Sequence, residues 1–160
     1  MQDGRAHTPK NLFLIVGKFE LPHYVILRRS FEEGNEYVLH RHTIPSFIPL
    51  VAFSEEHLSR GVGGLERFAL EVHRHLILLS NRTAIVARLR SLEDVHEVKA
   101  DEAMRLVELT TEPWTAKIML LDKGERCVVV NHEGRRLQDV EKSILSEGRK
   151  DLVERISDAL

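Results

Sequence analysis

The chain opens with short apolar runs, a pattern that indicates strands. Three such runs predict strands at residues 11–19, 24–29 and 36–43. Gly34 and Asn35 lie in the second link and can adopt the positive φ that a tight hairpin needs. Short links between consecutive strands favour antiparallel pairing. The first part of the chain is therefore expected to form a three-stranded meander.

The third predicted strand should divide its side chains between two faces, because successive residues of a strand point in opposite directions. On this reading one face carries Tyr37, Leu39 and Arg41. The other face carries Val38, His40 and His42.

A corner with two prolines follows this strand, in the stretch 37–50 (YVLHRHTIPSFIPL). Pro45 and Pro49 each fix their own φ and push the preceding residue toward extended geometry. The segment therefore cannot be helical and cannot continue as a central strand. We expect it to leave the sheet and hold its apolar residues against a core: Ile44, Phe47, Ile48 and Leu50.

The hydrophobic period changes after the corner. Ser54 is a predicted N-cap with carboxylates behind it, and Gly61–Gly64 interrupts the first turns. From Leu65 an apolar stripe at three- and four-residue spacing predicts a helix. Asn81 and Arg82 are interpreted as a joint. A second helix should then begin at Thr83 and run to about Val95.

A second group of strands and helices follows. Residues 103–110, 115–121 and 126–131 are predicted strands, with hairpin chemistry at residues 122–125. Amphipathic patterns at 137–145 and 151–160 predict two helices, separated at Gly148.

Runs of hairpin-linked strands followed by runs of helices favour an α+β fold, with helices on one face of small antiparallel sheets. The chain divides into two similar halves, predicted as residues 1–82 and 83–160. A half of about 80 residues is small for an independent core. A three-stranded sheet also has two open edges, which proteins usually cover or pair. Together these features predict completion by another subunit.

Composition narrows the possible classes of protein. The chain has 160 residues, of which 42% are hydrophobic and 30% charged, as in soluble globular domains. Its net charge of −2 argues against a nucleic-acid or anionic-membrane surface as the main activity. The one cysteine, Cys127, excludes an internal disulfide and fits a reducing compartment. No long apolar segment or signal-peptide pattern is present, so we expect a soluble, intracellular protein.

Candidate chemical groups are few, and each has a simpler structural interpretation. His40 and His42 are spaced to share a strand face, as some metal ligands do, but further ligands would have to come from elsewhere. His73 and His75 lie on a predicted helix, where residues two apart diverge. Cys127 lies in a predicted strand and is most simply a small buried hydrophobe. The sequence thus predicts no catalytic, cofactor or metal site.

Gly61–Gly64 precedes a helix, as phosphate-binding loops do. No Lys-Ser or Lys-Thr follows it and no strand directly precedes it, so a flexible loop is the favoured interpretation.

The chain resembles the RWD fold, in which a Pro-x-x-x-Pro corner follows the sheet. Here the predicted strands are followed by a corner with Pro45 and Pro49 and then by helices. Ile44 stands where that family usually has an aromatic residue. The wider stretch 40–50 (HRHTIPSFIPL) is similar to that of the centromere protein O family, fungal-type members above all. Residues 68–76 and the Gly148-Arg149 pair are also similar. The resemblance assigns Pro45, Phe47 and Pro49 to a structural motif.

This resemblance implies tandem RWD units and a non-enzymatic role in the nucleus, at the centromere and kinetochore. It implies pairing with centromere protein P and binding to the centromere protein Q and U pair, within the COMA assembly. It implies no cofactor, no membrane and no direct nucleic-acid contact. A helix and a strand expected before Asn11 are not evident, which indicates either a truncated chain or a reduced first unit.

Two other classes stay open at the level of sequence. RWD units resemble ubiquitin-conjugating domains, so Cys127 could carry a thioester, although no His-Pro-Asn precedes it. An RWD adaptor of another pathway, such as sumoylation or translational control, is the third interpretation. The residues that contact a partner are not identified by the sequence.

Overall fold

The computed structural model describes residues 11–16, 22–29, 37–59, 63–146 and 150–160. The chain forms two compact units, unit 1 spanning Met1–Ile77 and unit 2 spanning Leu78–Leu160. The division falls a few residues before the predicted boundary at 82. The predicted turn at Gly34-Asn35 and the predicted break at Gly148 lie outside the described residues.

Unit 1 contains a three-stranded antiparallel sheet in the order β1-β2-β3, which confirms the predicted meander. The strands are β1 (Asn11–Val16), β2 (His23–Arg29) and β3 (Tyr37–His42). Alternate residues of β2 point into the core, so that Val25 and Leu27 are fully buried. The β2–β3 pairing shifts register between Ile26 and Leu27, which marks a β-bulge.

The proline corner delivers the chain to helical turns. Pro49 is the N-cap residue of α1 (Leu50–Phe53), which continues as the π-helical turn η1 (Ser54–Leu58). The prediction that Ser54 is an N-cap is wrong, because the helical turns already begin at Leu50. Ser54 closes α1 instead, and its hydroxyl donates to the carbonyl of Val51 at 2.8 Å.

Helix α2 (Gly64–Arg90) runs without interruption through Asn81 and Arg82, so the predicted joint is wrong. Thr83 is not an N-cap, because its hydroxyl donates to the carbonyl of Leu79 within the helix, at 2.9 Å. The reason is local: between Gly64 and Arg90 the sequence has no proline or further glycine, and Asn or Arg inside a helix costs little.

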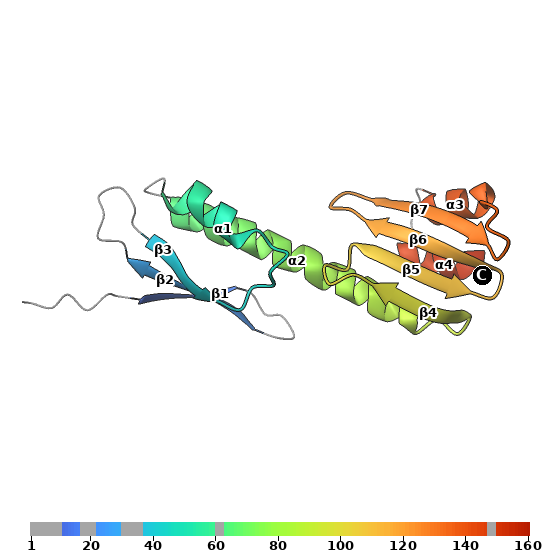
Figure 1. Ribbon diagram of the computed structural model, residues 1–160, viewed down its shortest axis with the longest axis horizontal. Coiled ribbons are helices and arrows are strands. Elements are labelled where there is room, and N and C mark those ends of the chain that lie inside the picture. The colour runs from blue at the N-terminus through green and yellow to red at the C-terminus, as the bar shows by residue number, and fades with distance from the viewer. Residues whose placement is uncertain (1–10, 17–21, 30–36, 60–62, 147–149) are drawn as a thin grey trace, which may run out of the picture. The chain divides into compact units, whose positions relative to one another are not determined.

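The core of unit 1 lies between the sheet, the corner and α2. Figure 1 shows α1 and the first part of α2 beside the sheet β1–β3. The buried residues are Val25, Leu27, Ile44, Ile48, Leu50, Leu58, Phe68, Val72 and Leu76.

Unit 2 contains a four-stranded antiparallel meander, β4-β5-β6-β7. The strands are β4 (Val95–Ala100), β5 (Leu106–Thr111), β6 (Trp114–Leu120) and β7 (Glu125–Asn131). Three of them confirm predicted strands, with shifted bounds.

Strand β4 was not predicted, because Val95 was expected to end a helix. In the structure α2 ends at Arg90 and β4 begins at Val95. The sequence of β4, VHEVKA, has few apolar residues, and a bulge between Val95 and Glu97 disturbs their alternation. The strand at β5 also begins later than predicted, because Met104 has a φ of 52° and belongs to a turn.

Two helices cover one face of this sheet, as Figure 1 shows for α3 (Gln138–Leu145) and α4 (Leu152–Ala159). Both confirm predicted helices. Asp151 caps α4: its carboxylate accepts from the N–H of Glu154, whose own carboxylate accepts from the N–H of Asp151. The apolar core of unit 2 includes Val86 and Leu89 from the last turns of α2.

Both units therefore have a small antiparallel sheet with helices on one face, which confirms the predicted α+β class. Within the described ranges, no helix is long and apolar enough to cross a membrane.

Candidate partner-binding surfaces

The proline corner buries three of its four apolar residues as expected. Ile44, Ile48 and Leu50 are almost fully enclosed in the core of unit 1. The corner is held by a turn, in which the N–H of Ile48 donates to the carbonyl of Pro45 at 3.1 Å. Phe47 differs from the expectation, because 38% of its surface is exposed. Burial on both sides fixes the corner, and an aromatic ring is left at the surface.

The bulge in β3 separates two histidines that were expected to share a face. The register passes from Leu27 opposite Leu39 to Ile26 opposite Arg41, which leaves His40 as the extra residue. His42 then lies opposite the buried Val25, and directly opposed residues share a face.

His40 approaches the other face, where its Nε2 lies 3.4 Å from the guanidinium of Arg28. The predicted common face of His40 and His42 is therefore wrong, and Arg41 also changes sides. A strand with an extra residue loses its simple alternation. His73 and His75 lie on α2 as predicted, and Nδ1 of His75 donates to the carbonyl of Glu71, 2.9 Å away.

Cys127 lies in β7, opposite Ile118 of β6, and its side chain is buried in the core of unit 2. Burial, with a smaller contribution from the charge of Glu141, raises the pKa of the thiol to about 12. A reactive cysteine needs a lowered pKa and access to solvent. This geometry favours the interpretation of Cys127 as a packing residue and gives no support to a thioester.

The glycines before α2 allow a close approach of two backbones. Gly63 has a φ of 84°, and a Cβ added at Gly64 would overlap the carbonyl oxygen of His57. Both features require the absence of a side chain. Gly61 and Val62 lie outside the described residues. The two described glycines thus have a packing role between η1 and α2.

Two buried polar contacts in unit 2 were not found by sequence reasoning. Arg82 of α2 is buried, and its guanidinium donates to the carboxylate of Asp122 at 2.7 Å. Glu141 of α3 is also buried and accepts from Arg136 at 2.8 Å. Neither pair has a sequence signal, because the partners lie on different elements or beyond a turn.

The solvent face of the unit 2 sheet carries a group of exposed apolar side chains among charges. Leu106 of β5 lies directly opposite Met119 of β6, and Val128 of β7 lies opposite Lys117. Lys117 in turn approaches the carboxylate of Glu108 at 3.8 Å. The other face of each strand is buried in the core.

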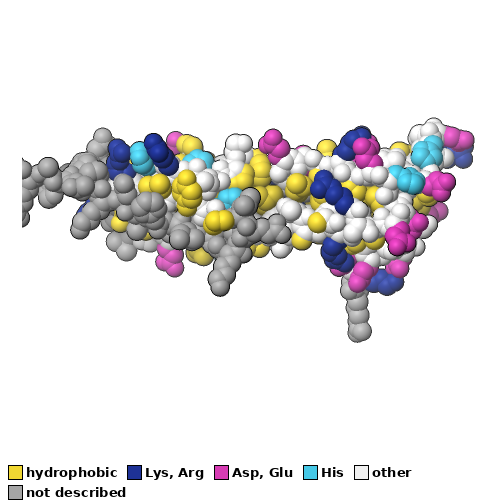
Figure 2. Space-filling model, turned by 90° about the horizontal axis from the view of Figure 1, so that it is seen from below, with side chains coloured by type: hydrophobic (Ala, Val, Ile, Leu, Met, Phe, Trp, Pro, Cys, Tyr) yellow, Lys and Arg dark blue, Asp and Glu magenta, His cyan; other side chains and the backbone are white. Residues whose placement is uncertain are grey.

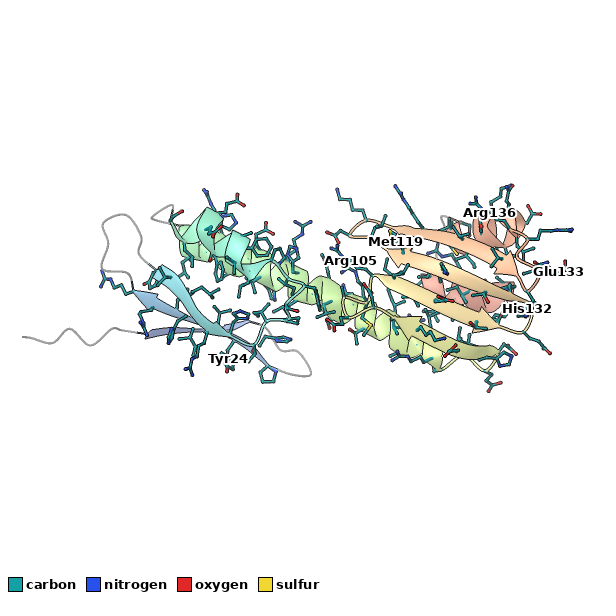
Figure 3. All side chains as sticks on the ribbon, in the orientation of Figure 1. Tyr24, Arg105, Met119, His132, Glu133 and Arg136 are labelled. Carbon is teal, nitrogen blue, oxygen red and sulfur yellow. The ribbon has the colours of Figure 1, made fainter. Side chains whose placement is uncertain are left out.

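This face has distinct ends. Figure 3 shows Arg105 and Met119 near one end of the sheet, and His132 and Glu133 at the other. Figure 2, turned by 90° from this view, shows hydrophobic side chains interspersed with charged ones on another side of the molecule. Apolar content alone does not distinguish a partner interface from other protein surfaces, because the two differ little in it.

Unit 1 also exposes large apolar side chains. Tyr24 of β2 and Val38 of β3 lie on the solvent face of its sheet, where Figure 3 labels Tyr24. Val51 of α1 and Leu70 of α2 are 60% and 61% exposed. In the part of the chain that the structure describes, no group of three or more His, Cys, Asp or Glu residues could hold a metal ion. The described surfaces thus offer apolar contacts in both units.

Comparison with known families gives a match over most of the chain. The family model described as Cenp-O kinetochore centromere component matches residues 12–157. Among curated proteins, none matches the chain. The family match spans nearly all of the 160 residues and includes most of both compact units. The chain therefore belongs to the Cenp-O family of kinetochore centromere components.

Proposed function

We propose that this chain is a non-enzymatic structural adaptor of the inner kinetochore. In this role it pairs with centromere protein P and binds the centromere protein Q and U pair within the COMA assembly. It acts in the nucleus, at the centromere, and supports kinetochore assembly and chromosome segregation. The observation that carries the proposal is the match to the Cenp-O family over residues 12–157.

The architecture supports a role in assembly. Each unit has one sheet with a largely solvent-facing side, on which apolar residues such as Val38 and Met119 are exposed. Burying such residues in a partner interface would remove apolar surface from water, at roughly 25 cal/mol per Å². A stable subunit interface of this kind buries about 2,000 Å² or more in total.

We further propose that the two units are tandem RWD units. In unit 1, strands are followed by the corner with Pro45 and Pro49 and then by helices. In unit 2 a four-stranded meander is followed by two helices, and its link at 132–137 has no proline. We propose that Pro45, Phe47 and Pro49 form the structural motif of the first unit only.

The test is reconstitution with the partner. Co-expression with centromere protein P should give a complex with one copy of each chain, measured by size-exclusion chromatography with light scattering. The isolated chain should self-associate or precipitate, because its apolar faces stay exposed. A stable monomer that forms no complex with centromere protein P would contradict the proposal.

A further inference from the structure

Strand β3 lies at the edge of its sheet and faces a hollow. The strand order is β1-β2-β3, and no described strand pairs with the outer side of β3. Beside residues 37–39 lies a hollow of about 320 Å³. We call it the β3 groove. Its lining residues are Tyr37, Val38, Leu39, Val51, Ser54, Glu55, Leu58 and Ser59.

Among the described residues, the outer edge of β7, unlike that of β3, is hydrogen-bonded by other residues of this chain. The N–H of Val129 donates to the carboxylate of Glu141 at 2.9 Å, and the carbonyl of Val129 accepts from the N–H of Leu137 at 2.8 Å. Val130 forms an isolated bridge with Arg136. The chain thus closes this edge with its own residues, as proteins usually do. Over the described residues, no comparable hydrogen bond closes the outer edge of β3.

The groove has the features of a strand-addition site. An added strand lies about 4.8 Å from its neighbour and satisfies the edge N–H and C=O groups. On the far wall Val51 supplies apolar surface, and Glu55 is an exposed carboxylate. The bulge at His40 ends regular pairing, so an added strand would pair with residues 37–39. A hollow of this volume holds one or two side chains rather than a helix.

We propose that the β3 groove binds an extended segment of a partner chain by strand addition. The segment is apolar at alternate positions and carries Lys or Arg opposite Glu55. This inference rests on the proposed function, because in the heterodimer the segment comes from centromere protein P. It goes further in naming the surface and the backbone conformation of the bound segment.

The experiment uses the co-expressed complex and two matched variants. Val51→Glu places a charge in the groove wall, whereas Leu70→Glu places the same charge at an equally exposed position outside the lining (60% against 61% exposed). Amide hydrogen exchange is measured over residues 37–43 in the complex and in each variant. Partner affinity is measured in parallel, and circular dichroism checks that both variants are folded.

Strand addition should slow amide exchange at residues 37–39 when centromere protein P is bound. Val51→Glu should remove this protection and weaken binding by about tenfold or more, since a charge loses hydration in an apolar contact. Leu70→Glu should keep the protection. Ser59→Arg, which places a long side chain at another lining position, should act like Val51→Glu.

Other outcomes overturn the inference. A complex that forms without protection of residues 37–39, or in which Val51→Glu and Leu70→Glu behave alike, rules out the β3 groove and leaves the proposed function intact. Absence of any complex with the wild-type chain rules out both proposals.

Discussion

The carboxylate of Glu141 accepts the backbone N–H of Val129 at 2.9 Å, so a side chain of helix α3 completes the open edge of strand β7. The same carboxylate accepts from the Arg136 guanidinium at 2.8 Å. These hydrogen bonds, those from Arg136 first, hold the pKa of Glu141 below its ordinary value despite burial. Glu141 thus joins helix, link and sheet in unit 2.

Replacing Glu141 should make unit 2 less stable in a pH-dependent way. Because its folded pKa is lowered, the carboxylate contributes stability above its unfolded pKa, about 4.3, and this contribution disappears as pH falls below that value. Glu141→Ala should lower the free energy of unfolding by about 1–3 kcal/mol at pH 7. Glu141→Gln should lose less, and its stability should fall less between pH 5 and pH 3.

Urea denaturation at pH 7, 5 and 3 measures this effect. Asp139→Asn is the control, because Asp139 lies on the same helix with its side chain exposed. If the free energy of unfolding falls equally between pH 5 and pH 3 in the wild type and in Glu141→Gln, another carboxylate causes the loss of stability in acid.

Gly64→Ala should destabilise unit 1, because the new Cβ would overlap the backbone oxygen of His57. Backbone cannot rotate away as a side chain can, so we expect a loss of about 2 kcal/mol or more in the free energy of unfolding. Gly63→Ala is the comparison. It meets open space but has a φ of 84°, and should cost about 1 kcal/mol through backbone strain alone. A smaller loss for Gly64→Ala than for Gly63→Ala in thermal denaturation would contradict the close approach.

Removing Asp122 from its pair with Arg82 should lower the free energy of unfolding more than replacing the buried, charged Arg82 itself. Asp122→Ala removes the carboxylate that accepts from the buried guanidinium of Arg82, and should lower the free energy of unfolding by about 2 kcal/mol or more. Arg82→Met replaces the charge with an apolar side chain of similar length, so it should cost less. Chemical denaturation of both single variants and the double variant measures the coupling. A larger loss for Arg82→Met would mean that the packing of the arginine stem dominates.

Cys127 should be inert in the folded chain. Its thiol is buried, and its pKa of about 12 leaves almost no thiolate at neutral pH. Labelling with a thiol reagent at pH 7.5 should be slow until denaturant unfolds the chain, and then at least a hundredfold faster. Cys127→Ala should label not at all and should keep partner binding. Rapid labelling of the native chain, or a thioester lost in Cys127→Ser, would favour the ubiquitin-conjugating interpretation.

Local sequence was sufficient for much of the fold. Apolar runs with short links predicted six of the seven described strands within a few residues of each end, and amphipathic spacing predicted α3 and α4. Pro45 and Pro49 predicted the corner, because proline restricts its own backbone and that of the residue before it. These features depend on neighbours along the chain, so they are visible without a fold.

Features that depend on distant partners were missed. Strand β4 has a weak pattern and is held as an edge strand by pairing with β5. Helix α2 continues past Asn81 and Arg82 because apolar residues on both sides of them pack into the two cores. The bulge that separates His40 from His42 is a property of pairing with β2, and one extra residue reverses every later side chain.

The sequence by itself determined the class of fold, the corner and, through the stretch 40–50, the family. Only the tertiary structure decided which groups are buried together and which face solvent: Arg82 with Asp122, Glu141 with Val129, and Phe47 at the surface. The physical reason is that backbone geometry is set within a few residues, whereas burial and edge pairing are set by segments far apart in the chain.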